Sequence, residues 1–371
     1  MKPKILIDSI ALLTPLTGIG RYTYEIAKEL SKNSNIEYNY YYGYISKELG
    51  ETEKKDHIKK LKKLFTHFSL LKKIARRIIN ITTSLSQTKY DLYWQPNFIP
   101  NSGIKAKKIV TSVHDFSFIL HKDFHPKERI EYFERYFFQN VVKSDAIITG
   151  SHYSKQEILE RLPAFSDQDV HVIYHGIDHS LFRLYEKEPL AFELPEKFIL
   201  SVGSIEPRKN LIGLLQAYEL LPLALKDSYK LVLVGFKGWQ NQEIMEIMEK
   251  NKHNIIYLGF ISDEELARVY NRATAFVFPS FYEGFGLPLI EAFACGTPVI
   301  SSNRSSLPEV GSDAVLYCDP DDITDIANKI QQLLEDEALQ QRLRQKGLQR
   351  AKLFSWEKSA KEHEKVFMSL L

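Results

Sequence analysis

Two glutamates and two glycines that could bind a ligand or act on it lie close together in the stretch PSFYEGFGLPLIEAFACGTP, residues 279–298. Glu283 and Glu291 are eight positions apart, so a regular helix would separate them by at most ~12 Å along its axis. Between them, Gly284 and Gly286 have no Cβ, which lets the backbone approach a ligand closely. The free N–H groups at the start of the following helix attract an anion. The spacing therefore predicts that the two glutamates bind different parts of one extended, negatively charged ligand.

Two adjacent cations, Arg208 and Lys209, lie in the segment VGSIEPRKN. We expect a helix near Ile205–Tyr218, and cations at a helix start oppose its dipole unless an anion or a carboxylate lies nearby. Arginine can bind a phosphate through two parallel hydrogen bonds, and lysine adds a compact charge. The pair therefore indicates a phosphate-binding site, with a purely structural role as the alternative.

Further candidates follow predicted strands in the first half of the chain. His114 ends the strand KKIVTSV, where open α/β sheets bind their ligands, although a histidine that only caps the strand is the alternative. Gly18, Ile19 and Gly20 follow the first predicted strand in the segment TPLTGIGRY. Thr23 stands where a dinucleotide fingerprint needs a small residue, and the loop is too long for that motif. We therefore interpret these residues as a loop lining a substrate cleft, or as a surface turn.

These residues require elements to hold them, and the sequence predicts alternating strands and helices. An apolar run, ATAFVF (Ala273–Phe278), a glycine turn and a short helix that stops at Gly296 form one such unit. Similar alternation elsewhere predicts parallel sheets covered by helices, an α/β fold. A polar segment, residues 175–197, separates two alternating blocks. The length allows two domains, which we place at 1–180 and 181–354, followed by a helical tail.

Composition narrows the class of protein. The formal net charge of +2 gives no sign of a nucleic-acid partner. Cys295 and Cys318 are the only cysteines, too few for a disulfide framework, which favours a reducing compartment. The N-terminal segment resembles a first strand rather than a signal peptide, and no apolar run is long enough to span a membrane. We therefore expect a cytoplasmic protein.

One segment differs in charge from the rest. Between Lys54 and Arg77 there are ten lysines or arginines and a single acid, Asp56, and apolar residues recur at helical spacing. A basic amphipathic helix within residues 54–79 suits an anionic membrane surface, such as the inner face of the plasma membrane. The alternative is a domain helix that faces its own core.

A carboxylate cluster, Asp319, Asp321 and Asp322, precedes the helical tail. Aspartates ahead of a helix stabilise its N-terminus, so we expect capping rather than metal binding. No histidine or cysteine cluster offers a better metal site, and we expect no metal cofactor.

A series of motifs in order resembles the retaining GT-B glycosyltransferases of family four over nearly the whole chain. The motifs are TGIGRY, VHD, GSHYSKQEI, HGID, VGSIEPRKN, LVLVG, FISDEEL, EGFGLPLIEA, GTPVISS and LPEVGSDA. The E-x₇-E block with the upstream PRKN is the specific part, whereas VHD and HGID are weak signals. The resemblance implies two Rossmann-like domains that face each other across a donor and acceptor cleft. It also implies that a last helix, 355–371, packs back on the N-terminal domain.

The resemblance further implies a role for each candidate residue. Glu291 would bind the ribose of the donor, and Glu283 would lie beside the transferred sugar. Arg208 and Lys209 would hold the diphosphate, while His114 would meet the sugar from the opposite domain. The implied donor-binding set is Gly203, Arg208, Lys209, Gly284, Phe285, Gly286, Leu287 and Glu291. The implied catalytic set is His114, Arg208, Lys209 and Glu283, and Gly18, Ile19 and Gly20 would close the cleft over phosphate and acceptor.

The function implied is transfer of a hexose from a nucleotide-sugar, a co-substrate, to a hydroxyl of a glycan or lipid-linked glycan with retention. Fixed cations and a helix N-terminus would stabilise the leaving diphosphate without a metal. The opening TGIGRYTYE resembles bacterial mannosyltransferases of surface-polysaccharide assembly, which favours GDP-mannose. UDP-glucose or another UDP-sugar is the alternative donor. Alternatives of another class are a nucleotide-sugar epimerase and a non-catalytic glycan- or membrane-binding module.

Overall fold

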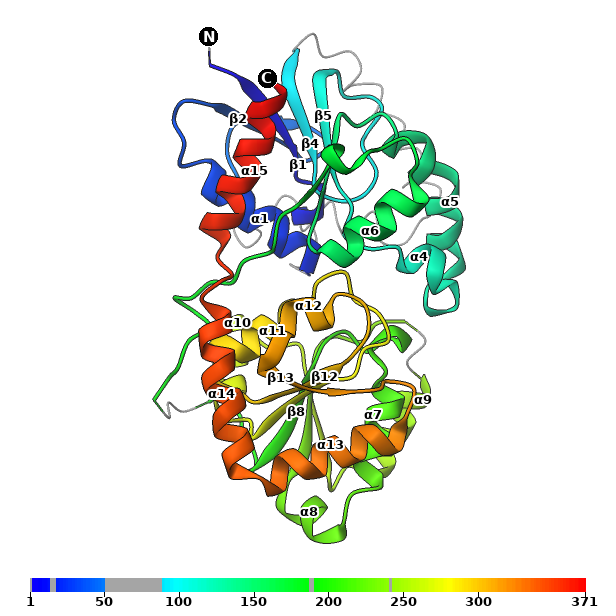
Figure 1. The fold of residues 1–371 in the computed structure, drawn as a ribbon, viewed down its shortest axis with the longest axis vertical. Helices are drawn as coiled ribbons and strands as arrows, with labels where there is room; N and C mark the ends of the chain where they lie inside the picture. The colour runs from blue at the N-terminus through cyan, green and yellow to red at the C-terminus, as the bar shows by residue number, and fades with distance from the viewer. Residues whose placement is uncertain (1, 14–17, 51–88, 187–189, 240–241) are drawn as a thin grey trace.

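The structure is a computed structural model that describes residues 2–13, 18–50, 89–186, 190–239 and 242–371. Two α/β units lie one above the other, each a parallel-type sheet covered by helices (Figure 1). This arrangement is the GT-B fold that the motifs predicted. The basic helix predicted within residues 54–79 lies outside the described residues.

The N-terminal unit contains a seven-stranded sheet in the order β3-β2-β1-β4-β5-β6-β7. All neighbouring strands are parallel except β2 and β3, which are antiparallel. The strands are β1 Lys4–Asp8, β2 Glu37–Tyr41, β3 Ile45–Ser46, β4 Tyr90–Gln95, β5 Ala106–Ser112, β6 Ala146–Thr149 and β7 Val170–Val172. The helices are η1 Ile10–Leu13, α1 Gly18–Leu30, α4 Ser117–Leu120, η2 Lys122–Phe124, α5 Lys127–Val141, α6 His152–Arg161 and η3 Asp167–Asp169.

The C-terminal unit contains a six-stranded parallel sheet in the order β10-β9-β8-β11-β12-β13. The strands are β8 Phe198–Val202, β9 Lys230–Val234, β10 Ile255–Gly259, β11 Ala275–Phe278, β12 Val299–Ser302 and β13 Val315–Cys318. The helices are η4 Pro207–Lys209, α7 Leu211–Glu219, α8 Leu223–Ser228, α9 Gln242–Lys250, α10 Asp263–Arg272, α11 Leu287–Ala294, α12 Leu307–Gly311, η5 Ser312–Ala314, α13 Ile323–Glu335 and α14 Glu337–Ala351. One more helix, α15 Trp356–Leu370, follows them in the chain. Central strands such as β8 and β11 are buried throughout and largely apolar, because helices cover both faces of the sheet.

The last helix, α15, leaves the C-terminal unit and packs on α1 of the N-terminal unit (Figure 1). Ser355 caps it by accepting a hydrogen bond from the backbone N–H of Lys358. Trp356 and Phe367 join the apolar core of the N-terminal unit. The predicted return of the C-terminal helix to the N-terminal domain is therefore confirmed.

The segment between β7 and β8 forms neither helix nor strand in its described parts, 173–186 and 190–197. It crosses between the units beside the start of α15. A Cβ placed on Gly176 would lie only 2.1 Å from the backbone nitrogen of Trp356. The two segments that cross between the units are thus in van der Waals contact. The domain boundary at residues 180 and 181 lies in the segment between β7 and β8 and stays a prediction.

His363 on α15 gives folding stability a pH dependence. Its ring Nε2 lies 2.6 Å from the hydroxyl of Tyr22 on α1, and Nδ1 lies 2.7 Å from the carbonyl of Ser359. Burial lowers the pKa of His363 to about 4, against the opposing effect of the Ser359 carbonyl and with a further lowering by His114. The unfolded chain, with a histidine pKa of about 6.5, therefore binds more protons between pH 6.5 and 4.

We expect the free energy of unfolding to fall by up to about 3 kcal/mol from this group as pH drops through that window. Denaturant unfolding at pH 7.0 and 4.5 measures the change. His363→Gln removes the titrating ring, so its stability should depend less on pH than that of the wild type. Equal pH dependence in both proteins would contradict this assignment.

Candidate active site

The glycine loop at the end of β11 leads directly into α11. The helix begins at Leu287 after Gly286, whose φ of 101° lies in the left-handed region that favours glycine. No side chain caps this helix start. Pro288 has no N–H and that of Leu289 donates to the Gly286 carbonyl, which leaves the N–H of Leu287 at the helix start for an anion. Anion binding at this stretch stays a prediction.

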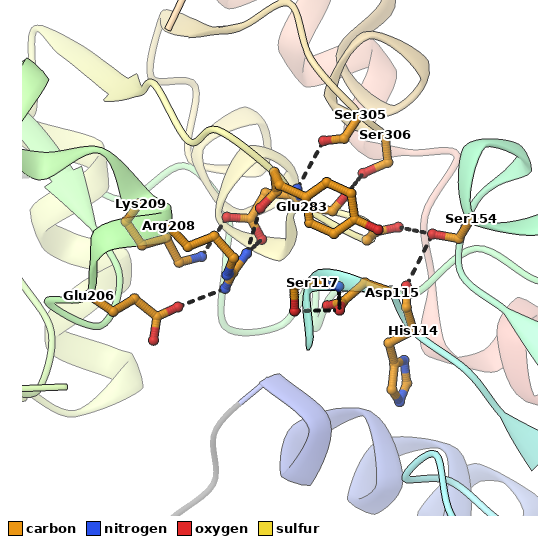
Figure 2. A network of polar contacts seen from close by, with 12 residues as sticks. His114, Asp115, Ser117, Ser154, Glu206, Arg208, Lys209, Glu283, Ser305 and Ser306 are labelled. Atoms are coloured by element: carbon orange, nitrogen blue, oxygen red, sulfur yellow. Dashed lines mark hydrogen bonds and ion pairs between the residues drawn. The ribbon is translucent and has the colours of Figure 1, made fainter. Parts of the chain in front are cut away.

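Beside this helix start, the structure brings Glu283 into contact with both predicted cations (Figure 2). Glu283 Oε1 lies 2.7 Å from Lys209 Nζ, and Oε2 lies 2.7 Å from Arg208 Nη1. Burial alone would raise the pKa of Glu283, but the two cations outweigh it and lower the pKa to about 2. Glu283 is therefore ionised at neutral pH.

The other side of the Arg208 guanidinium pairs with a second carboxylate. Its Nη2 lies 2.9 Å from Oε1 of Glu206, which is itself buried. Burial opposes the charge on Arg208, yet Glu283 and Glu206 together raise its pKa above the usual value. The group is a network of four side chains in which acidic and basic groups alternate.

The predicted helix near Ile205–Tyr218 is wrong in its start. Arg208 and Lys209 lie in the short 3-10 turn η4. Asn210, with φ of 54°, breaks the helical conformation before α7 begins. The left-handed Asn210 is incompatible with a continuous helix. The two cations therefore precede α7 and do not lie in its first turn, and the carboxylates that pair with them are Glu206 and Glu283.

Gly203 follows β8 and lies beside this network. A Cβ on Gly203 would come within 3.4 Å of the Lys209 side chain. The residue thus leaves space for the lysine to reach Glu283.

Glu291 lies on α11 and is engaged by the other domain. Its Oε1 is 2.9 Å from Nη1 of Arg21 on α1, and its Oε2 accepts a hydrogen bond of 3.2 Å from Tyr270. Arg21 also pairs with Asp263. Burial raises the pKa of Glu291, Arg21 opposes that rise, and Asp263 adds to it. Sequence reasoning missed Arg21, although it stands directly after the glycines of TGIGRY.

The glycine residues before Arg21 belong to the helix itself. Gly18 is the first residue of α1, not part of a loop ahead of it, and a Cβ there would lie 3.9 Å from Leu287. Ile19 packs against the apolar cluster around α5, and Gly20 is buried. The structure brings this first turn of α1 to the start of α11. Its predicted role, closing the cleft over phosphate and acceptor, stays a prediction.

His114 contributes its backbone to the centre of the site, while its ring points away from Glu283 (Figure 2). The ring Nε2 lies 2.8 Å from the carbonyl of Pro96, and the ring packs edge-on against Tyr22. Burial lowers the pKa of His114, against the effect of the Pro96 carbonyl. The role of this ring beside a sugar stays a prediction.

The loop that carries Glu283 is held by α6 of the opposite domain. The carbonyl of Gly284 accepts hydrogen bonds from Ser151 Oγ at 2.8 Å and Ser154 Oγ at 3.3 Å. Glu309 of α12 in turn accepts bonds from the first two N–H groups of α6, at 2.8 and 3.1 Å. These contacts join the segments that follow β6 and β11 across the interface.

The phenol of Tyr282 makes a further contact between the domains. It donates a hydrogen bond to Glu157 of α6 and accepts one of 2.9 Å from the backbone N–H of Phe116. Sequence reasoning missed Glu157, Glu309 and the two serines, because the motifs GSHYSKQEI and LPEVGSDA were noted only as whole segments. The result is a loop fixed on both sides of Glu283.

The aspartates ahead of α13 have structural partners. Asp319 and Asp321 pair with Arg304 at 2.9 and 3.0 Å, and Asp322 caps α13. Within the described residues, no group of three histidine, cysteine or acidic side chains is arranged to hold a metal ion. In the same residues, no helix combines the length and apolar character needed to cross a membrane.

A two-unit parallel α/β fold with its polar site between the units defines the GT-B class. Sucrose-phosphate synthase from Thermosynechococcus elongatus has the same fold, with a TM-score of 0.71, 20% identity, and coverage of 100% of this chain and 99% of its own. Anabaena HepE in complex with UDP-glucose gives a TM-score of 0.69 and 16% identity, with 99% of each chain covered.

Two family models divide the chain between them. The model for glycosyltransferase family 4 matches residues 16–181, and that for glycosyl transferases group 1 matches residues 183–350. The O-antigen chain mannosyltransferase B of Escherichia coli is 35% identical, and the match covers 95% of this chain and 96% of that protein. The chain belongs to the family 4 glycosyltransferases.

Proposed function

We propose that this glycosyltransferase moves a mannosyl residue from GDP-mannose to a hydroxyl of a growing surface glycan, with retention at the anomeric carbon. The observation that carries the proposal is the pairing of Arg208 and Lys209 with Glu283 at the uncapped start of α11. The 35% identity to an O-antigen chain mannosyltransferase supports mannose and a polysaccharide acceptor.

The cation cluster suits the charge that develops in this reaction. As the glycosidic bond to the nucleotide breaks, negative charge accumulates on the diphosphate, and fixed cations stabilise that state most. Arg208, Lys209 and the N–H groups of Phe285 to Leu287 would hold the diphosphate without a metal. The diphosphate then competes with Glu283 for the two cations, which frees the Glu283 carboxylate to contact the transferred sugar.

Glu291 provides a test of donor binding. We expect Glu291→Ala to weaken GDP binding by about tenfold or more, because a buried carboxylate that accepts ribose hydroxyl bonds is lost. Calorimetry with GDP measures the affinity, and the exposed Glu249 gives a matched control as Glu249→Ala. Unchanged GDP affinity in Glu291→Ala would remove the ribose role from this residue.

A UDP-sugar is the second candidate donor, because a protein of the same fold, HepE, binds UDP-glucose. Incubation of purified protein with GDP-mannose and UDP-glucose in turn, with measurement of nucleoside diphosphate release, distinguishes the two. Turnover with UDP-sugars alone would overturn the mannose assignment. Binding of neither GDP nor UDP would favour a non-catalytic module.

A further inference from the structure

Arg129 is a cation in an unfavourable position. It lies in the first turn of α5, where the helix dipole repels positive charge, and the preceding Pro126 provides no side-chain cap. Within the described residues its Nε is buried without a hydrogen-bond partner, and the guanidinium forms no ion pair. Arg129 is partly buried, and a cation drawn out of water without a counter-charge costs free energy, so the group favours a bound anion.

Aromatic rings from both domains hold the guanidinium in place. Its central carbon lies 5.6 Å from the ring of Phe133 on α5 and 5.8 Å from the ring of Trp239 in the C-terminal unit. Trp239 is fixed by a hydrogen bond from its indole nitrogen to the carbonyl of Phe124. Arg129 is thus pre-positioned at the domain interface, not free in solvent.

A second unpartnered polar group lies next to it. His125 is only 5% exposed, its Nε2 lies 3.0 Å from Ser117 Oγ, and its Nδ1 has no partner among the described residues. Burial, and then Arg129, lower the pKa of His125 to about 4, so its ring is neutral at pH 7. A neutral imidazole can donate one hydrogen bond to an anion without adding charge.

The carboxylates nearest to Arg129 are engaged elsewhere. Asp115 accepts bonds from the backbone and hydroxyl of Ser117, at 2.9 and 2.7 Å, and Glu206 pairs with Arg208. Asp115 and Glu206 act on Arg129 only at longer range, and burial together with Arg208 keeps its pKa below the usual value. The charge of Arg129 is therefore left for a ligand.

We propose that Arg129 and His125, at the start of α5, form a phosphate-type anion subsite distinct from the cluster of Arg208 and Lys209. The inference rests on the proposed glycosyl transfer for its assignment to the acceptor. Arg129 belongs to the N-terminal domain, opposite the donor cluster, so the anion is one that the acceptor carries close to the hydroxyl that is glycosylated. A phosphate of the donor is the other source of the same chemistry.

Pyrophosphate provides a direct probe of this subsite. Protein saturated with GDP or UDP, so that the donor cluster is occupied, is titrated with inorganic pyrophosphate in a calorimeter. The wild type should bind pyrophosphate in addition to the nucleotide, and Arg129→Gln should weaken this binding by at least tenfold. Arg135→Gln, a change on the exposed side of the same helix, should leave it unchanged. Thermal unfolding checks that each variant is folded.

The remaining outcomes distinguish an anion of the acceptor from the donor diphosphate, and failure of the subsite from failure of the proposed function. Absence of additional pyrophosphate binding, or equal binding by Arg129→Gln, overturns the subsite. If Arg129→Gln weakens binding of GDP or UDP instead of pyrophosphate, the anion is the donor diphosphate and the acceptor assignment is wrong. If neither nucleotide binds, the proposed function fails independently. In that case, titration of the Arg208→Met protein with pyrophosphate alone still reports on Arg129, with the same two variants.

Discussion

Replacement of Arg208 with methionine is expected to lower kcat for sugar transfer by ~10²–10³-fold, the usual cost of removing one preorganised group that stabilises developing negative charge. Methionine retains much of the apolar stem but not the guanidinium, so Glu206 and Glu283 lose their shared partner. The loss should be larger in kcat than in the KM for the donor, because the contact strengthens as the diphosphate leaves. Steady-state release of nucleoside diphosphate measures both parameters.

The same variant should change the pH profile. With Arg208 absent, the pKa of Glu283 should rise from about 2, because burial then outweighs the one remaining cation, Lys209. Activity should therefore fall at a higher pH on the acid side than in the wild type. The matched control is Arg304→Met, which breaks exposed ion pairs in the same domain and should leave kcat unchanged. An Arg208→Met enzyme with wild-type kcat would remove this residue from the chemistry.

Gly284→Ala is expected to reduce activity by at least ~100-fold through misplacement of the catalytic loop against the opposite domain. A Cβ at this position would lie 2.1 Å from the carbonyl oxygen of His114, and neither partner is a flexible side chain. The two domains would have to separate, which also breaks the bonds from Ser151 and Ser154 to the Gly284 carbonyl. Small-angle scattering should show a more open molecule, and kinetics should show the loss of turnover.

Ser280→Ala is the control in the same loop. Ser280 is fully buried, and its hydroxyl has no partner among the described residues, so its removal should be close to neutral. The affinity of Gly284→Ala for nucleoside diphosphate alone should fall much less than kcat, since Arg208 and Lys209 lie in the C-terminal unit. Wild-type turnover in Gly284→Ala would contradict the tight approach of the two domains.

Sequence reasoning succeeded where the relevant signals lie within one element. The strand, glycine loop and helix around Glu283 follow from local residue types, and the return of the last helix follows from the family resemblance of the ordered motifs. The start of the helix after Lys209 was wrong because Asn210 takes a left-handed conformation that spacing alone does not reveal.

The contacts between the domains could not be predicted in this way. Arg21 and Glu291 are 270 positions apart, and their ion pair depends on how two separately folded sheets are placed. The same is true of Ser151 with the Gly284 carbonyl and of Trp239 over Arg129. Periodicity specifies which face of a helix is buried but not which partner from a distant domain covers it.

The return of α15 to the N-terminal unit has a consequence for synthesis on the ribosome. Trp356 and Phe367 complete the core that Trp94 and Tyr22 begin, so the first domain to emerge lacks part of its packing until α15 is translated. Domains usually fold as they emerge, starting with the N-terminal one. Here the C-terminal domain has all of its strands while the first is still unfinished, and a nascent chain that stops short of α15 exposes an apolar surface to chaperones.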